Sequence, residues 1–405
     1  MAIFLHSSGK DYTYYELIEC VNQCQSYRPM CQTKDLYDYF VNFIVALVSN
    51  RSLVLVDADS GQNDLPELDF NKVNALVTIE KSNFTTVDDL INAVLNSTSK
   101  VTIFTSGTTG QPKKVVHTIS ALTRAVRKGH RYKDQIWAYA YNPTHMAGLQ
   151  VFFQIFANQG TLVDVFNMSR DVVYQMIDKF SITHISATPT FYRLLLPFER
   201  IHESVIRITL GGEKSDLHLY ESIQRIFPNA KINNVYASTE AGSLFAAKDD
   251  CFQIPEDIRN KFLVKDDELL IHKSLLGESS SFIFDNEFYH SGDLIEWVNK
   301  EEGVFRFKSR RNELINVGGY KVNPAEVEDI INSLDAVQQS VVYGRSNSIL
   351  GNIVVAEVQL TLDSMLTDID IRQQLIGKLQ DFKIPRKIKI VKSLELTKTG
   401  KLKRR

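Results

Sequence analysis

The sequence predicts an α/β protein in which a large N-terminal domain, made of parallel α/β sheets and a β-rich part, precedes a small α+β C-terminal domain. Three changes along the chain carry this prediction. Between residues 34 and 236, short β-rich runs alternate with amphipathic helical stretches, a pattern typical of parallel sheets covered by helices. After Gly242 the runs are typical of antiparallel strands, and after Asn312 strands and helices mix in a smaller unit.

The predicted elements follow these three stretches. Strands of the first stretch are predicted at Ser52–Val56, Val101–Phe104, Ile136–Tyr141, Thr161–Val165, Thr183–Ala187, Ile206–Leu210 and Lys231–Tyr236. Amphipathic helices between them include Arg170–Phe180 and Asp216–Ile226. Strands of the β-rich part are predicted at Leu263–His272, Ser281–Phe284 and Val304–Lys308. The last unit is predicted to contain helices at Ala325–Ser333 and Ile371–Gln380 and strands near Gln339–Tyr343 and Val354–Leu360.

Composition limits the class of protein. The chain has 405 residues, of which 44% are apolar and 23% charged, as in ordinary globular proteins. No apolar run approaches the roughly 18 residues of a membrane span, and the start of the chain lacks a secretion signal, so we expect a cytoplasmic protein with no membrane span. The four cysteines form no paired C-x-x-C set, which favours reduced thiols over a zinc site.

The charges are distributed unevenly. Five basic residues and no acidic residue fall in the tail, which we define as residues 396–405, although the whole chain has 46 basic and 48 acidic residues. An acidic remainder argues against a nucleic-acid partner, because such proteins carry a broad basic surface.

The segment from Thr105 to Lys113 has the composition of a phosphate-binding loop. It follows a predicted strand, is predicted to precede a helix, and contains hydroxyls, glycines and a lysine: Thr105, Ser106, Gly107, Thr108, Thr109, Gly110, Gln111, Pro112 and Lys113. Glycines let backbone N–H groups approach an anion, and hydroxyls add donors. The segment lacks the Gly-Lys-Ser/Thr ending of a Walker A loop. A flexible turn is the alternative interpretation.

Four later segments carry further candidates. Asn234 to Glu240 end a predicted strand, where parallel α/β sheets bind ligands, so Glu240 could hold Mg²⁺ and Tyr236 could stack on a base. Asp293 ends a His-Ser-Gly-Asp turn and could bind a ribose diol. Arg310 and Asn312 precede a Val-Gly-Gly-Tyr-Lys stretch, and Lys401 follows Thr-Gly in the tail. Each segment also has an ordinary interpretation when it is considered alone. Glu240 would be a loop carboxylate, Asp293 would end a common β-turn, the Val-Gly-Gly stretch would be another turn, and Lys401 would lie in a frayed terminus.

Taken in order, the five segments resemble the adenylate-forming superfamily, which includes acyl- and aryl-CoA synthetases, adenylation domains of peptide synthetases and luciferases. The resemblance extends from Tyr12 to Lys401. It implies an adenylation domain at 1–311 and a mobile C-terminal lid at 312–405. It also implies a reaction in two steps. A carboxylate attacks the α-phosphate of ATP to give acyl-AMP and pyrophosphate, and a thiol then displaces AMP.

The resemblance also implies roles for individual residues. It assigns catalysis to Lys401, Glu240 and Thr239, and a Mg²⁺ ligand to Glu240. It assigns ATP binding to Thr105, Ser106, Gly107, Thr108, Thr109, Gly110, Lys113, Asn234, Tyr236, Asp293 and Arg310. Asn312 occupies the hinge position, although aspartate is commonest there. Gly319 lies on the face that admits the thiol, where a side chain would obstruct a narrow pantetheine tunnel.

The substrates are indicated less directly. The stretch around His145 resembles the gate of the acyl pocket in CoA ligases, and no aspartate for a substrate ammonium is found there, which favours an acid without an α-amino group. Gly211, Gly212 and Glu213, also assigned to the pocket, argue against this choice, because they resemble the peptide-synthetase and D-alanine-ligase version of that loop. The absence of a fused carrier domain means that the thiol must come from a separate molecule. The expected partners are therefore a small carboxylic acid, ATP and CoA.

Two alternatives stay open at this point. The enzyme could charge the phosphopantetheine thiol of a separate acyl carrier protein, since no carrier domain is fused. The chain could also be a degenerate nucleotide-binding regulator, although Lys401, Glu240 and Asp293 are all present. The identity of the acid and the oligomeric state are not indicated. Only 104 residues precede the predicted phosphate loop, fewer than in most members of the superfamily.

Overall fold

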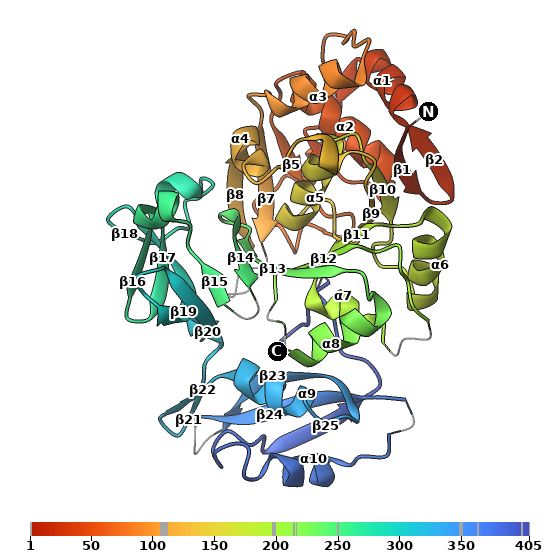
Figure 1. The fold of residues 1–405 in the computed structure, drawn as a ribbon. Helices are drawn as coiled ribbons and strands as arrows, with labels where there is room; N and C mark the ends of the chain where they lie inside the picture. Colours follow the sequence, from red (N-terminus) through yellow and green to blue (C-terminus); the bar gives the residue numbers. More distant parts are fainter. Residues whose placement is uncertain are drawn as a thin grey trace.

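The N-terminal part is built around two sheets of mainly parallel strands (Figure 1). The computed structural model describes residues 2–105, 112–196, 200–213, 215, 217–248, 251–347, 351–362, 364–397 and 400–404. In the larger sheet, the strands from β13 to β1 run parallel and β2 is an antiparallel edge. These strands are β1 (Ile3–Ser7), β2 (Lys10–Thr13), β9 (Ile136–Tyr139), β10 (Thr161–Asp164), β11 (His184–Ala187), β12 (Arg207–Gly211) and β13 (Lys231–Ser238).

The second sheet has three parallel strands and one antiparallel strand. They are β4 (Met30–Cys31), β5 (Leu53–Leu55), β7 (Lys100–Thr105) and β8 (Lys113–Thr118). A separate short pair joins β3 (Ser26–Tyr27) to β6 (Val77–Thr78). The prediction of a helix after the phosphate-binding segment is wrong. Lys113–Thr118 contains β-branched residues that suit a strand, and β8 pairs antiparallel with β7, so that Lys113 lies opposite Thr105.

Helices cover the two sheets. They are α1 (Tyr14–Gln23), α2 (Leu36–Val48), α3 (Val87–Leu95), α4 (Ile119–Thr123), α5 (Met146–Phe156), α6 (Arg170–Phe180), α7 (Pro189–Leu194) and α8 (Leu217–Ile226), with 3₁₀ turns η1 (Phe70–Lys72) and η2 (His130–Tyr132). Both α2 and α5 are almost fully apolar and bury their aromatic rings against each other, with the Phe40 and Phe152 centroids 4.7 Å apart. No helix among the described residues is long and apolar enough to cross a membrane.

The β-rich part extends the larger sheet with antiparallel strands, as predicted. They are β14 (Gly242–Lys248), β15 (Cys251–Gln253), β16 (Phe262–Lys265), β17 (Glu268–His272), β18 (Phe284–Asp285), β19 (Phe288–Asn299) and β20 (Val304–Arg310), with η3 (Glu256–Lys261) and η4 (Lys273–Leu275). The single strand predicted at Leu263–His272 is in fact a hairpin, because Asp266 and Asp267 adopt positive φ and reverse the chain. Strand β19 was not predicted from the sequence.

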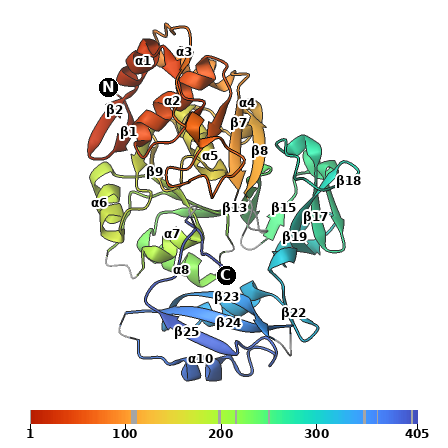
Figure 2. The same cartoon turned by 180° about the vertical axis from the view of Figure 1, so that it is seen from behind.

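The C-terminal unit has its own sheet and its own apolar core. It follows η5 (Arg311–Glu313) and consists of β21 (Ile315–Val317), β22 (Tyr320–Val322), α9 (Pro324–Asn332), β23 (Val337–Asn347), β24 (Gly351–Leu360), α10 (Asp368–Leu375) and β25 (Lys387–Val391). Its core cluster draws only on residues between Ile315 and Ile388. In both views the unit lies below α7 and α8, and the chain end returns between it and these helices (Figures 1 and 2).

Candidate functional site

A cavity of about 960 Å³ opens where the three parts of the molecule meet. It lies at the carboxyl ends of parallel strands, the usual place for ligands in α/β sheets. Twelve of the predicted site residues line it: Thr105, Lys113, His145, Gly211, Gly212, Tyr236, Thr239, Glu240, Asp293, Arg310, Asn312 and Lys401. Ser106, Gly107, Thr108, Thr109 and Gly110 lie outside the described residues, and so does Thr399. Residues far apart in the sequence thus share one cavity of ligand size.

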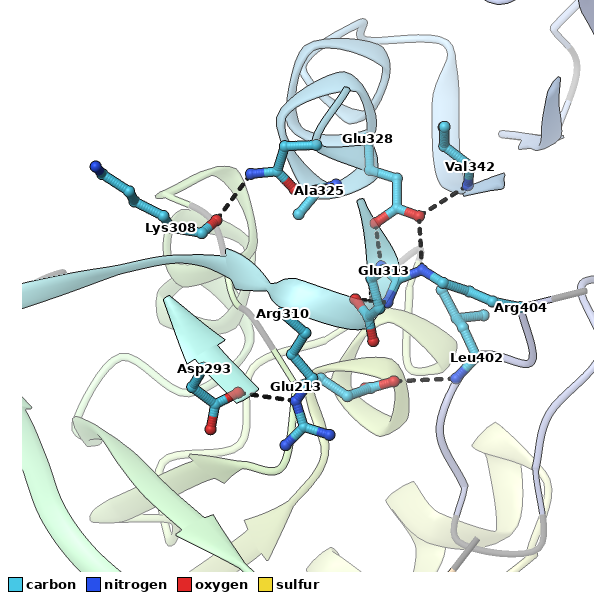
Figure 3. Close-up of polar contacts among 11 residues, drawn as sticks. Glu213, Asp293, Lys308, Arg310, Glu313, Ala325, Glu328, Val342, Leu402 and Arg404 are labelled. Carbon is cyan, nitrogen blue, oxygen red and sulfur yellow. Dashed lines mark hydrogen bonds and ion pairs between the residues drawn. The ribbon is translucent and has the colours of Figure 1, made fainter. Parts of the chain in front are cut away.

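A buried carboxylate lies at one side of the cavity. Asp293 on β19 is directly opposite Arg310 on β20 in the antiparallel register, so their side chains meet. Asp293 Oδ1 accepts a hydrogen bond from Arg310 Nε at 2.9 Å (Figure 3). Oδ2 accepts one from the Tyr236 hydroxyl at 2.6 Å. The Asp293 charge raises the pKa of the Arg310 guanidinium. Because Asp293 is only 5% exposed, these two partners hold its carboxylate in a fixed direction.

Tyr236 presents an aromatic ring to the same side of the cavity. Its ring stacks on Phe307, with centroids 4.6 Å apart, and burial raises the pKa of its hydroxyl well above the usual range. Asn234, two residues earlier on β13, is not among the residues that line the cavity. Its side-chain amide instead donates to Ser215 Oγ at 3.1 Å.

The loop that follows β13 is held by hydrogen bonds from β8 and from the segment around Gly277. His117 Nε2 lies 2.8 Å from the Thr239 carbonyl oxygen, a contact that requires the proton on Nε2. The Glu240 carbonyl accepts a hydrogen bond from the Gly277 N–H at 2.8 Å. Burial lowers the pKa of His117, which favours its neutral form. The backbone of this loop is thus held partly by the same hairpin that carries Thr105 and Lys113 at the end where β7 connects to β8.

Asp57, which was not predicted from the sequence, lies beside His145. Asp57 Oδ2 lies 3.8 Å from His145 Nε2 and also accepts a hydrogen bond from the Asn142 amide. Burial would raise the pKa of Asp57, but the contacts with His145, Asp59 and Asn142 lower it overall. The available signal was the position of Asp57 just after the strand β5.

Gly148, on the first turn of α5, lets the helix approach the loop that precedes His145. A methyl group at Gly148 would collide with the Asn142 carbonyl oxygen. The glycine therefore allows the helix start and the Asn142 loop to pack closely beside the cavity.

Lys401 enters the cavity from the tail and passes over Gly212. A methyl group built on Gly212 would lie 3.1 Å from Lys401 Cε and 3.3 Å from Nζ, and Gly212 has φ +83°. Burial lowers the pKa of the Lys401 ammonium, and the Arg310 charge lowers it further, while Glu213, Glu240 and Glu313 oppose the shift. Gly212 thus provides the space that the lysine occupies.

Glu213 has a different environment from its two glycine neighbours. It is not among the cavity-lining residues, and its carboxylate accepts hydrogen bonds from Thr190 and from the Leu402 N–H. Glu213 therefore contacts the tail, whereas the sequence analysis assigned it to the substrate pocket.

A second buried carboxylate links the Asp293 turn to the segment before Asn312. Glu268 accepts a hydrogen bond from the Gly292 N–H at 2.8 Å and pairs with Arg311 at 3.2 Å. It also lies 3.1 Å from His290 Nδ1. Glu268 was not predicted as a site residue, although a carboxylate inside the predicted apolar strand Leu263–His272 was an available signal.

The predicted hinge and thiol-face residues lie in different surroundings. Asn312 lines the cavity, whereas Gly319 lies on the β21–β22 hairpin outside it. Gly319 has φ +93°, and a Cβ there would meet no atom within 4 Å. The glycine is required by this turn, and in this arrangement of the two parts it faces open space.

The described residues contain no cluster of three or more histidine, cysteine, aspartate or glutamate side chains that could hold a metal by themselves. A single carboxylate at the cavity is nevertheless sufficient for Mg²⁺ that is shared with substrate phosphates, because Mg²⁺ keeps several waters and needs only one or two protein carboxylates. Glu240, which lines the cavity, fits that requirement.

Comparisons with known proteins agree with this geometry. The family model described as AMP-binding enzyme matches residues 49–262, and the model of the AMP-binding enzyme C-terminal domain matches residues 326–401. A 2-succinylbenzoate–CoA ligase from Listeria innocua is 26% identical over 384 residues, which covers 86% of this chain and 79% of the relative. The acyl-CoA synthetase ALT10 from Alternaria alternata is 24% identical over 398 residues, which covers 84% of this chain and 69% of the relative.

A solved structure has the same fold. The o-succinylbenzoate CoA synthetase MenE from Bacillus subtilis, in complex with the acyl-adenylate intermediate OSB-AMP, superimposes with a TM-score of 0.71 at 20% identity. The superposition covers 99% of this chain and 94% of the other. The two parts of the chain and their order along the sequence are therefore those of a known architecture.

Proposed function

Because the chain belongs to the AMP-binding enzyme family, we propose that it is an AMP-forming acid–thiol ligase, which converts a carboxylic acid to acyl-AMP and then to a CoA thioester. One observation carries this proposal: Lys401, Glu240 and Asp293 face one cavity although they come from three different parts of the chain. A family member that had lost its activity would have no need to keep a lysine from the tail at this position.

We assign the two sides of the cavity to the two ends of ATP. Tyr236 offers a ring face for adenine, and the Asp293 carboxylate can accept hydrogen bonds from the ribose hydroxyls. Thr105 and Lys113, which face each other at the end where β7 connects to β8, would contact the phosphates together with the predicted loop between them. Mg²⁺ bound by Glu240 and the phosphates would neutralise phosphate charge.

In the first step, the acid's carboxylate oxygen forms a bond to the α-phosphorus while the bond to pyrophosphate breaks. Negative charge shifts toward the leaving oxygen, and a fixed cation beside the phosphorus stabilises that transition state. Lys401 supplies this cation. The carboxylic acid itself would lie beyond His145, where Leu122, Val126 and Trp137 provide apolar surface.

In the second step, the thiol sulfur attacks the acyl carbonyl carbon and AMP leaves. We propose that residues 1–311 form a body and residues 312–405 a lid, that the lid turns about Asn312 between the steps, and that Gly319 then borders the thiol channel. Free CoA is the proposed acceptor, as the names of the relatives indicate. The cytoplasmic location stays a prediction, with which the four free cysteines agree.

The test is ATP–pyrophosphate exchange with a panel of aliphatic and aromatic carboxylic acids in the presence of Mg²⁺. Exchange that depends on one class of acid supports the proposal, and no exchange with any acid would favour a nucleotide-binding regulator. Free CoA and a phosphopantetheine-bearing carrier protein are then offered in parallel. Thioester formation with CoA alone supports the proposed acceptor, whereas turnover with the carrier protein alone contradicts it.

A further inference from the structure

The Glu213 carboxylate connects the body to the tail through both of its oxygens. Oε2 accepts hydrogen bonds from the Thr190 N–H at 3.1 Å and the Thr190 hydroxyl at 2.7 Å. Oε1 accepts a hydrogen bond from the Leu402 N–H at 3.0 Å (Figure 3). Hydrogen bonds to a charged carboxylate are stronger than neutral ones, and Leu402 directly follows Lys401.

The residue on the other side of Lys401 is held by the same helix start. The Thr188 hydroxyl donates to the Gly400 carbonyl at 3.1 Å, while it caps α7 by accepting the Phe191 N–H. The body thus binds the backbone immediately before and immediately after Lys401. Two such contacts fix both the position of the lysine Cα and the direction in which its side chain leaves the tail.

Arg404 attaches the tail to the lid. Its guanidinium pairs with Glu328 on α9 at 2.6 Å and with Glu313 at 2.8 Å (Figure 3). Glu328 also accepts a hydrogen bond from the Val342 N–H at 2.8 Å and is only 8% exposed. A buried carboxylate with these partners makes a strong anchor, because removing one partner would leave a buried charge unpaired.

We propose that Glu213 is a positioning residue that docks the lysine loop for the first half-reaction only, and that Arg404 is the anchor that orders the tail on the lid. This inference rests on the proposed two-step function. The Glu213 and Thr188 contacts join the body to the tail, so they must break when the lid turns. The Arg404 contacts lie within residues 312–405 and can persist through the turn.

A purely structural role for Glu213 is the competing explanation, since its bonds to Thr190 also stabilise the start of α7. The two explanations differ in the half-reactions that they affect. Loss of docking slows acyl-AMP formation and leaves thioester formation from supplied acyl-AMP unchanged. Distortion of α7 slows both, because its N-cap residue Thr188 lines the cavity used in both steps.

The decisive variants are Glu213→Ala and Glu213→Gln. We expect Glu213→Ala to slow acyl-AMP formation by about 10- to 100-fold, the effect of losing hydrogen bonds to a charged group. Thioester formation from supplied acyl-AMP should stay within about twofold of wild type. Glu213→Gln keeps one acceptor oxygen for the Leu402 N–H and should recover most of the loss. Glu221→Ala, on the exposed face of α8, is the matched control and should leave both half-reactions unchanged.

A readout that does not depend on activity is hydrogen–deuterium exchange of the Leu402 amide. Glu213→Ala should speed this exchange. The amides of α7 other than that of Thr190, which itself donates to Glu213, should keep their protection. Arg404→Met should also speed it, whereas Lys383→Met, which breaks the Lys383–Glu326 pair elsewhere on the lid, should not. If Glu213→Ala slows both half-reactions equally, or leaves the exchange of the Leu402 amide unchanged, the inference is overturned. If wild type activates no acid at all, the proposed function fails, while the exchange data still decide whether Glu213 docks the tail.

Discussion

The body and the lid hold their cavity-facing side chains in different ways. Tyr236, Asp293 and Arg310 sit on strands of one continuous sheet, where many ladder hydrogen bonds fix each backbone position. Lys401 sits in a short tail, and the described residues of this tail are hydrogen-bonded to the body through Thr188 and Glu213. Sheet strands suit groups that stay in place, and a tail held by individual hydrogen bonds suits a group that we propose leaves the cavity.

Lys401→Ala offers the largest test of this difference. We expect acyl-AMP formation to fall by about 10²–10³-fold, because the variant removes a preorganised cation from the reacting phosphate. Thioester formation from supplied acyl-AMP should survive. Pyrophosphate exchange and single-turnover assays measure the two steps separately. Lys403→Ala is the control, since Lys403 pairs with Glu395 in the same tail. Equal loss in both steps would contradict the assignment of Lys401 to the first step.

Acid pH should weaken the body and spare the lid, because all nine histidines precede residue 312. Burial, and secondarily Arg207, lowers the pKa of His184 to about 4, against about 6.5 in an unfolded chain. Between these values the unfolded chain binds a proton that the folded chain does not, so stability falls as pH drops. A single histidine with this shift lowers the free energy of unfolding by about 3 kcal/mol as the pH falls from about 6.5 to about 4.

This prediction is checked by urea unfolding at pH 7 and pH 4.5, followed through Trp137, which stacks on His184 with centroids 4.7 Å apart. His184→Phe keeps the stacking and removes the titration, so its stability should depend less on pH. A pH dependence that is the same in this variant would show that other groups cause the acid sensitivity.

Asp293→Ala tests whether the body side binds ATP. Losing a charged partner of the ribose hydroxyls should weaken ATP binding by roughly 2–3 kcal/mol, measured by titration calorimetry. The variant also leaves Arg310 and Tyr236 without their shared partner, so the melting temperature must be measured as well. Asp267→Asn, which removes the charge of an exposed pair with Lys308 and keeps a residue type that tolerates positive φ, is the control. Unchanged ATP affinity would remove Asp293 from the nucleotide site.

Gly212→Ala probes the contact between the two regions and should have the smallest effect. Positive φ costs an alanine about 1–2 kcal/mol of stability, and here the new methyl group would also press on Lys401. Gly9→Ala is the matched control, because Gly9 has φ +78° and open space around its Cα. Both variants should lose similar stability, but only Gly212→Ala should slow acyl-AMP formation, by about tenfold or less. Equal rates in the two variants would show that the lysine has room to move aside.

Local pattern was enough to predict much of the fold. The alternation of β-rich runs and amphipathic helices predicted the parallel strands β9 to β13, and helix α6 begins and ends where the sequence indicated. Prediction failed where a local run fits two structures. Lys113–Thr118 became a strand because β7 offers it a partner, and Leu263–His272 became two strands because two aspartates reverse the chain.

The residue types of the site and their order along the chain can be recognised in the amino-acid sequence, because loop, turn and tail motifs are local. What those residues touch follows from the folding of the whole chain. The pairing of Asp293 with Arg310 depends on the register of two strands, and the position of Asp57 beside His145 depends on the approach of two sheets. The contact of Glu213 with Leu402 depends on a tail that returns to the body after crossing the whole lid. Hydrogen bonds act over about 3 Å, so side chains distant in sequence interact only when packing of the whole chain brings them that close.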